Sequence, residues 1–360
     1  MSDETAAAGV TSGGTIQSML AAIDANRYQT AALVIWILGM LTLPVWGKSV
    51  IYVAAFANIW AIFAMGWDII SGHTGYISFG HSFISGTAAY TTAILIYVVD
   101  PNMSIYITFP LSVVMAVVAG LVFGVPSLRL RGPYFSVITF VAVLLAVKAV
   151  YVFSKYTNGE LGISGVSVLS YNNTNLFYLT LFPMLLIAVG LVLVSKSNIG
   201  TILLAIRDNE PAVEAAGLDT TKFKIWGFVI SSVAMGIGGT MLAHFYGNVQ
   251  LSSFLVTDRS IEMIAMAVIG GMGTILGPIA GAYLLVLLRD SFFRIFLGPN
   301  ARWIALWVVV LVIIVSSPEG LFRRFWRFLG YIGEEGIGTY VSELPGRLRG
   351  YFSRIGGGRG

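Results

Sequence analysis

The sequence predicts an all-α integral membrane protein, a polytopic bundle of about ten spans with short broken helices. Hydrophobic residues form 57% of the 360-residue chain, charged residues form only 11%, and the mean hydropathy is +0.84. A soluble domain carries about 25% charged residues, so this composition could not cover a water-exposed surface. The apolar residues also gather in segments of about 20 residues, the length that a helix needs to cross a bilayer.

Nine apolar segments are candidate spans. In chain order they cover residues 28–46, 49–70, 76–99, 103–125, 133–153, 176–195, 225–245, 261–288 and 302–315. The eighth segment is too long for one simple span, and the run GGMGTILGPIAGA interrupts it at residues 270–282. Glycine and proline at this density predict two short helices with a break between them, of the kind that lines substrate paths in membrane proteins.

The distribution of positive charge predicts the topology. If residues 207–224 are cytoplasmic and the eighth segment crosses twice, fourteen Lys and Arg residues lie inside and six lie outside. A single crossing would instead place the seven arginines of the C-terminal tail outside. Cytoplasmic loops carry an excess of Lys and Arg, so two crossings are favoured, with both termini in the cytoplasm. The chain is then a cytoplasmic polar tail (residues 1–27), a transmembrane domain (28–317) and a basic cytoplasmic tail (318–360).

Several classes of function lack the residues that they need. The chain has no cysteine and only three histidines, which are scattered, so no metal site is expected. No Walker motif occurs, and no ordered Ser/His/Asp group points to catalysis, so we expect neither a catalytic nor a cofactor-binding site in this chain. The net charge of +4 is explained by the cytoplasmic loops and needs no nucleic acid.

A polar island at residues 207–224, reading RDNEPAVEAAGLDTTKFK, separates two long apolar segments. Pro211 can begin a helix, and Gly217 can end it in a left-handed conformation. The alanines between them give the helix a face of small side chains that could sit deep in a groove of a partner. Arg207, Asp208, Glu210 and Glu214 would then pair at the rim. From composition alone, an ordinary solvated loop fits equally well.

The run AIRDNEPAVEAAGLDTTKFKIWGFVIS, residues 205–231, resembles the cytoplasmic coupling loop of ABC importer permeases. It is similar in particular to the branched-chain amino acid ABC transporter permease family (LivM type), because Gly217 directly follows Glu214-Ala215-Ala216. Three more segments carry the resemblance: SGHTGYISFGHSFISGTAAYTTA at 71–93, LRLRGPYFSVITF at 128–140, and AVIGGMGTILGPIAGA at 267–282 with a later SPEGLF. In the first of these, Thr87 and Ala88 depart slightly from the family's pattern.

The resemblance implies an assembly of two permease subunits (a homo- or heterodimer), two ABC ATPase subunits that bind and hydrolyse ATP, and an external substrate-binding protein, in a prokaryotic plasma membrane. The ATPase-coupling loop, residues 205–224, would contain Arg207, Asp208, Glu210, Pro211, Glu214, Ala215, Ala216 and Gly217. The candidate translocation path contains Gly75, Gly80, His81, Gly86, Gly270, Gly271, Gly273, Gly277, Pro278 and Gly281. Close packing of helices through small residues is the competing role of these glycines.

Other readings stay open at this point. Similar permeases carry urea or short amides, and an ion-coupled secondary carrier would work alone but would need carboxylates near mid-membrane. Lys148, Asp68 and Glu262 are the ionisable groups in or near spans, and each is a functional hypothesis by default. His81 is expected to be a structural hydrogen-bonding residue.

Overall fold

The computed structural model describes residues 27–42, 47–130 and 132–335, and helices make up most of them. The chain divides into two compact units. The larger unit comprises residues 41–324, and the smaller comprises the residues up to 40 together with those from 325 onward. All of the individual residues that the sequence singles out as functional lie in the larger unit.

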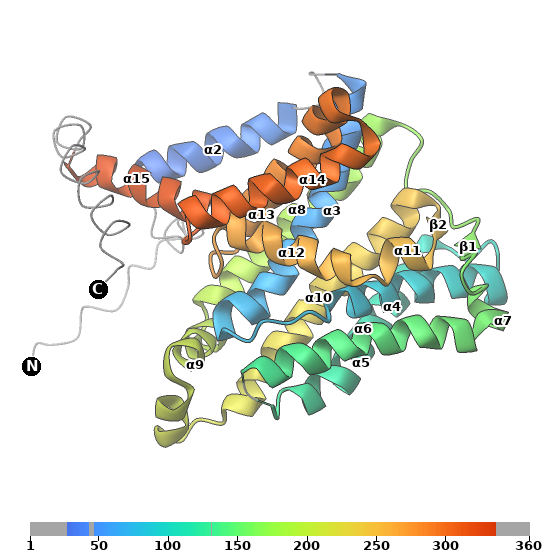
Figure 1. The fold of residues 1–360 in the computed structure, drawn as a ribbon, viewed down its shortest axis with the longest axis horizontal. Coiled ribbons are helices and arrows are strands. Elements are labelled where there is room, and N and C mark those ends of the chain that lie inside the picture. Colours follow the sequence, from blue (N-terminus) through green and yellow to red (C-terminus); the bar gives the residue numbers. More distant parts are fainter. Residues whose placement is uncertain (1–26, 43–46, 131, 336–360) are drawn as a thin grey trace, which may run out of the picture. The chain divides into compact units, whose positions relative to one another are not determined.

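The larger unit is a bundle of long helices joined by shorter elements (Figure 1). Its elements are α3 (Lys48–Trp67), η2 (Asp68–Gly72), α4 (His81–Ile94), η3 (Leu95–Val99), α5 (Ile105–Ser127), α6 (Pro133–Val152), α7 (Ser154–Thr157), β1 (Ile163–Ser164), α8 (Asn173–Lys196), α9 (Asn198–Ala215), α10 (Thr220–Tyr246), β2 (Asn248–Val249), α11 (Leu251–Phe254), α12 (Thr257–Gly270), α13 (Leu276–Leu287), η4 (Leu288–Phe292) and α14 (Phe293–Ser316).

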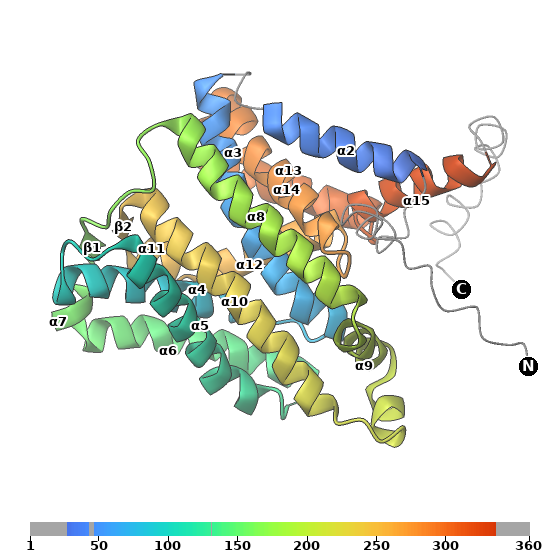
Figure 2. The same cartoon turned by 180° about the vertical axis from the view of Figure 1, so that it is seen from behind.

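Helix α3 forms the centre of this bundle and packs against α8, α10 and α13 (Figure 2). It is apolar on all sides, as expected for a helix surrounded by others, and Trp60, Phe63 and Trp67 are fully buried. The buried side-chain amide of Asn58 on α3 forms hydrogen bonds to two neighbouring helices. It donates to Thr180 Oγ1 on α8 at 3.0 Å and accepts from the Tyr283 hydroxyl on α13. These bonds lock α8 and α13 onto α3.

Helices α5 and α6 turn much of their apolar surface outward. In the most apolar stretch of each helix, only 22% of α5 and 28% of α6 is buried, whereas 89% of the corresponding stretch of the central helix is buried. Exposed side chains such as Tyr106 and Val122 on α5 suit contact with lipid tails, which are as apolar as the side chains themselves.

Helices α12 and α13 form an antiparallel pair, here called the hairpin, with a turn at residues 271–275. Glu262 near the start of α12 contacts Arg289 just beyond α13, whereas Gly270 and Gly277 meet beside the turn. A Cβ atom on Gly281 would collide with the carbonyl oxygen of Met266, so only glycine lets the two backbones approach this closely. The hairpin therefore begins and ends at the same end of the bundle, as two crossings require.

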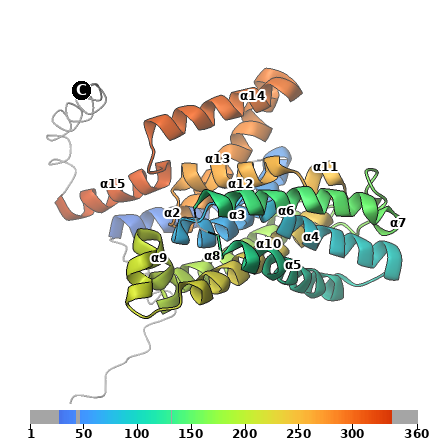
Figure 3. The ribbon, with the colours of Figure 1, turned by 60° about the horizontal axis from the view of Figure 1, so that its bottom comes forward.

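The two ends of the bundle carry different small elements (Figures 1 and 3). Helix α9 lies at one end, here called the coupling end. The antiparallel pair of β1 and β2 lies at the opposite end, with Ile163 opposite Val249. At the end of α14, Gly320 packs against Gly271 of the hairpin turn, which places this part of the chain at the coupling end. The side of the membrane on which the basic tail lies stays a prediction, and residues 336–360 of that tail lie outside the described part.

The smaller unit contains most of α2 (Arg27–Thr42) and of α15 (Leu321–Glu335). The Gln29 amide donates a hydrogen bond to the Trp326 carbonyl oxygen at 3.0 Å. The two helices are thus held together by a contact between residues 297 positions apart. The predicted tail over residues 1–27 falls almost wholly outside the described residues.

The all-α polytopic bundle with short broken helices is confirmed. Six helices in the described part of the chain are long and apolar enough to cross a membrane. The other predicted spans fall on α2, on the two arms of the hairpin and on α14. Helix α2 and the arms of the hairpin are shorter, and α14 is interrupted at Gly298. One predicted span begins too early: residues 75–80 are not helical, and α4 starts at His81. The left-handed Gly75, with φ of +75°, breaks the helix there.

Candidate coupling site

The polar island forms a short, capped helix at the coupling end, residues 210–217, here called the coupling helix. Helix α9 is broken at Asn209, whose φ of −160° and ψ of 88° are not helical. The Asn209 side chain accepts a hydrogen bond from the Ala212 amide at 3.2 Å, so it caps the second part of α9. Pro211 therefore lies inside the first turn, one residue later than the sequence predicts, where its missing N–H costs no helical bond.

The C-terminus of this short helix has the predicted glycine signal. Gly217 has a φ of +84°. Its amide donates to the Glu214 carbonyl at 2.9 Å, and the Leu218 amide donates to the Val213 carbonyl at 3.3 Å. This pair of bonds is the Schellman motif, which requires a left-handed residue where Gly217 stands. Asp219 then caps α10 by accepting from the Lys222 amide at 3.1 Å.

The small side chains of the helix face outward. Ala212, Ala215 and Ala216 are exposed, and Val213 alone between Pro211 and Asp219 is buried. Arg207, Asp208, Pro211 and Glu214 are exposed as well. The helix therefore presents a low, smooth surface with charges around it, which is the form expected of a helix that docks in a groove.

Glu210 departs from the expectation that it pairs with a partner at the rim. Its carboxylate accepts hydrogen bonds from Lys224 at 2.7 Å, from the Tyr76 hydroxyl at 2.5 Å and from Thr220 at 3.1 Å. The Lys224 ammonium also lies 4.6 Å from the centre of the Tyr76 ring. The side chains of Lys224 and Glu210 are only 3% and 12% exposed. Glu210 thus ties the coupling helix to α10 and to the segment before α4.

The electrostatics of Glu210 follow from these contacts. Partial burial by itself would raise the pKa of the Glu210 carboxyl. The hydrogen bonds from Lys224 and Tyr76 and the charge of Lys224 outweigh burial and hold the pKa below its ordinary value. The carboxylate is therefore ionised throughout the physiological pH range.

Arg207, on the part of α9 before the break at Asn209, bonds to the end of the central span. Its guanidinium donates to the Gly72 carbonyl at 2.6 Å, and its aliphatic stem lies beside Gly75. Asp68, fully buried one turn before Gly72, accepts the Gly273 amide at 2.7 Å and the Ile275 amide at 3.2 Å. The first part of α9 and the turn of the hairpin therefore both bond to residues 68–72 at the end of the central span, α9 through an arginine side chain and the turn through its backbone amides.

Ile275 in the hairpin turn has a strained backbone. Its φ of 57° places a β-branched residue in the left-handed region, where such residues are rare. A conformation of this kind costs about 1–3 kcal/mol and persists only where surrounding contacts hold it. Here the Asp68 carboxylate supplies one of those contacts, so Asp68 has a positioning role at the coupling end and not a free charge at mid-membrane.

Nine of the ten candidate translocation residues fall into two groups of close contacts within the subunit, and the tenth, Gly75, lies beside the Arg207 side chain. Gly80 packs on the Thr139 carbonyl and Gly86 on Leu255, while His81 is buried between the hydroxyls of Ser78 at 3.0 Å and Ser231 at 2.9 Å. The hydrogen-bonding role expected for His81 is therefore confirmed. The second group lies at or beside the hairpin turn and its arms: Gly270, Gly271, Gly273, Gly277, Pro278 and Gly281. The contacts of both groups are those of close helix packing, and their place on a substrate path remains a prediction.

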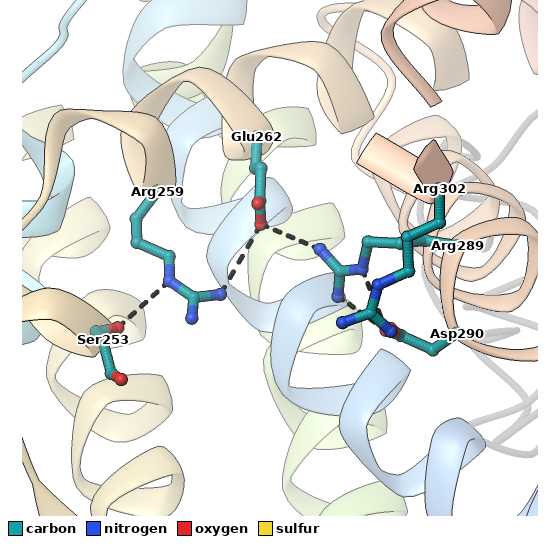
Figure 4. Close-up of polar contacts among 6 residues, drawn as sticks. All are labelled: Ser253, Arg259, Glu262, Arg289, Asp290 and Arg302. Atoms are coloured by element: carbon teal, nitrogen blue, oxygen red, sulfur yellow. Dashed lines mark hydrogen bonds and ion pairs between the residues drawn. The ribbon is translucent and has the colours of Figure 1, made fainter. Parts of the chain in front are cut away.

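A cluster at the opposite end was missed by the sequence reasoning. It contains Arg259, Glu262, Arg289, Asp290 and Arg302, here called the arginine cluster (Figure 4). The sequence signals were the i, i+3 spacing of Arg259 and Glu262 and the adjacent Arg289-Asp290. Neither signal shows that α12, η4 and α14 converge.

Lys148, another ionisable residue that the sequence places in a span, is exposed on α6. Among the described residues, no group of His, Asp and Glu side chains could hold a metal ion.

The fold and this site define a multi-pass membrane protein with an exposed helix that is hydrogen-bonded to its transmembrane core. The chain belongs to the family described as branched-chain amino acid transport system permease components, which it matches over residues 49–316. It is a multi-pass protein of the prokaryotic plasma membrane.

Individual relatives agree with this membership. The chain is 26% identical to the high-affinity branched-chain amino acid transport system permease protein LivM of Escherichia coli, over 76% of this chain and 70% of that protein. It is 26% identical to a probable LivM of Methanocaldococcus jannaschii, over 68% of this chain and 77% of that protein. It is 21% identical to the ribose import permease protein RbsC of Haemophilus influenzae, over 65% and 75% respectively. No solved structure matches the chain.

Proposed function

We propose that this chain is the membrane-spanning subunit of an ATP-driven ABC importer of branched-chain amino acids. The observation that carries the proposal is the exposed, capped helix at residues 210–217, which is bonded at its base to the transmembrane core. The permease names of the relatives supply the substrate class. A second permease subunit, two ATPases and an external substrate-binding protein would complete the assembly.

The mechanism follows from what the helix can transmit. When an ATPase closes on ATP, it would move the helix that sits in its groove. Glu210 would pull on Lys224 and Tyr76, and Arg207 would pull on Gly72, so the motion would reach α10, α4 and the hairpin turn together. This chain would perform no covalent chemistry, because ATP would bind and be hydrolysed on the partner.

The test is reconstitution with and without the partners. The full-length chain, co-purified with the ATPases, second permease and binding protein from neighbouring genes, is expected to accumulate leucine in liposomes only when ATP is supplied. The chain alone is expected to show no uptake under a proton or sodium gradient. Gradient-driven uptake by the chain alone would establish an ion-coupled carrier instead, and ATP-driven uptake of urea with no uptake of leucine would change the substrate.

A further inference from the structure

We propose that a pocket beside the arginine cluster binds the free amino acid as a zwitterion at the end of the bundle opposite the coupling end. This inference rests on the proposed function, since it names where that function's substrate would first contact this chain. The pocket has a volume of about 530 Å³, within the range of about 300–1,000 Å³ that is usual for ligand sites. Its lining residues are Tyr52, Val53, Phe56, Phe245, Tyr246, Asp290, Arg294 and Arg302.

The pocket wall combines both charges that an amino acid backbone needs. Asp290 lies between two guanidinium groups, 2.7 Å from Arg289 and 3.2 Å from Arg302 (Figure 4). Arg289 also forms an ion pair with Glu262 at 3.2 Å, and Arg259 lies 3.6 Å from the same Glu262 oxygen. Arginine is the side chain best suited to hold a carboxylate, through two parallel N–H donors.

The cluster carries more positive than negative charge. Three arginines share two carboxylates, and Arg294 at the pocket forms no ion pair with any described residue. The Nε atom of Arg302 is buried, and no hydrogen-bond acceptor for it exists among the described residues. Arg294 is an exposed residue of the pocket lining, and its charge has no described counter-ion, so the surplus of guanidinium charge at the pocket wall indicates a place for an anionic group.

The remaining walls suit an ammonium group and an aliphatic side chain. Asp290 Oδ1 accepts one hydrogen bond, from Arg302, and a carboxylate oxygen can accept a second, here from the ammonium; Tyr52 and Tyr246, whose rings can attract a cation, line the same pocket. Val53, Phe56 and Phe245 provide apolar surface for a branched hydrocarbon. The α-carboxylate would bind Arg302 and Arg294, the ammonium would bind Asp290, and the side chain would lie against α3 and the end of α10.

The position of the pocket fits first contact with the substrate. Tyr52 and Asp68 are sixteen residues apart on the central span, which is about 24 Å along a helix. Asp68 is at the coupling end, so the pocket opens at the far end, which faces outside in the predicted topology. The cluster is also bonded to the arms of the hairpin, whose turn contacts Asp68.

The absence of cysteine from the chain makes a direct test possible. Val53→Cys places a unique thiol in the pocket wall of the full-length protein, and Tyr52→Cys serves if the first variant does not insert. The thiol in nanodiscs is alkylated with a membrane-impermeant maleimide. Leucine is expected to slow this reaction. At equal concentration, 4-methylpentanoate, which lacks the ammonium, and 3-methylbutylamine, which lacks the carboxylate, are expected to protect at least about tenfold less well.

Matched variants separate binding from general damage. Tyr171→Cys, on an exposed residue that is not part of the pocket lining, is expected to react equally with and without leucine. In the Val53→Cys background, Arg294→Gln is expected to increase about tenfold the leucine concentration needed to protect the thiol. Lys155 is another cation predicted to lie outside, and Lys155→Gln is expected to leave that concentration unchanged. Asp290→Asn is expected to remove the preference for leucine over 4-methylpentanoate.

Three results would overturn the proposal. The first is a pocket thiol that does not react, or reacts at the same rate with leucine present. The second is equal protection by leucine and 4-methylpentanoate, which would indicate an anion site only. The third is protection by the substrate-binding protein regardless of leucine, which would indicate a protein docking surface. If the assembly takes up leucine with ATP but leucine does not protect the thiol, the pocket proposal is rejected and the importer proposal stands. If leucine protects the thiol but the assembly shows no ATP-driven uptake, the importer proposal is rejected and the pocket proposal stands.

Discussion

The Lys224 ammonium lies 2.7 Å from a carboxylate oxygen of Glu210, and the Tyr76 hydroxyl lies 2.5 Å from the other oxygen of the same group. These three residues come from α10, from the coupling helix and from the segment before α4, so one carboxylate joins this exposed helix to two parts of the transmembrane core. A movement of the helix cannot leave these contacts unchanged.

Removing the charge of Glu210 is therefore expected to uncouple the subunit without preventing insertion. Glu210→Gln leaves Lys224 buried without its counter-ion, and hydrogen bonds to charged groups contribute about 1.5–3 kcal/mol. We expect lower thermal stability in detergent and a loss of substrate-stimulated ATP hydrolysis in the assembly. Asp208→Asn, an exposed acid on the same element, is the control and is expected to change stability by under about 1 kcal/mol. Normal coupling by Glu210→Gln would remove this link from the mechanism.

The same contact predicts a dependence on pH. The folded-state pKa of Glu210 lies below its ordinary value of 4.5, because the bonds from Lys224 and Tyr76 outweigh the effect of burial. The carboxylate then contributes its full stabilisation above the ordinary pKa and loses it as the pH falls through the lower, folded-state pKa. Thermal unfolding of the wild type and Glu210→Gln between pH 7 and pH 3 should show a stability difference that is constant near neutrality and shrinks only below about pH 4.5. A difference that already shrinks near pH 6 would contradict this assignment.

The small face of the coupling helix is expected to be sensitive to bulk and not to charge. Ala215→Trp or Ala216→Trp adds a large ring to an exposed surface, so the isolated subunit should insert and melt like the wild type. A ring there cannot enter a groove shaped for alanine, so co-purification of the ATPases should be lost. Asp208→Asn should retain them. If the Trp variants bind ATPase and couple normally, the docking surface lies elsewhere.

Gly217 is expected to tolerate asparagine better than valine. At its φ of +84° a β-branched residue costs roughly 1–2 kcal/mol, whereas asparagine enters the left-handed region more readily. Apart from its two chain neighbours, no described residue lies within 4 Å of the position where a Cβ on Gly217 would stand, so the difference reports the backbone and not a clash. ATPase co-purification and thermal stability should fall for Gly217→Val and be largely kept for Gly217→Asn. Equal behaviour of the two variants would mean that the left-handed turn is unimportant.

Asp68 is expected to hold the hairpin turn in place. In Asp68→Asn, one carboxylate oxygen becomes an NH₂ donor that faces the amide of Gly273 or Ile275, so one buried donor loses its acceptor at a cost of about 1–3 kcal/mol. The melting temperature should fall, and coupling should fall with it. Asp258→Asn, on an exposed residue at the other end of the hairpin, should cost under about 1 kcal/mol. Transport that is lost in Asp68→Asn while stability is unchanged would indicate a direct transport role instead.

The sequence by itself determined the features that depend on neighbouring residues. The composition required a membrane protein, and segment lengths with charge asymmetry predicted the order of the spans and the double crossing of residues 261–288. Pro211, the alanines and Gly217 predicted the coupling helix, because helix caps and left-handed turns are local interactions between residues a few positions apart. The motif order predicted the family.

Only the tertiary structure decided which distant side chains share a site. Glu210 and Lys224 are fourteen residues apart, Asp68 and Gly273 are 205 apart, and Glu262 and Arg289 are 27 apart. No local periodicity specifies such pairs, since they depend on how the spans cross and where the hairpin returns. For the same reason the sequence predicted Glu210 as an exposed charge beside the docking face, whereas the fold packs it against α10. The pocket beside Arg302 could not be predicted either, because it depends on how α3, α10 and α14 converge.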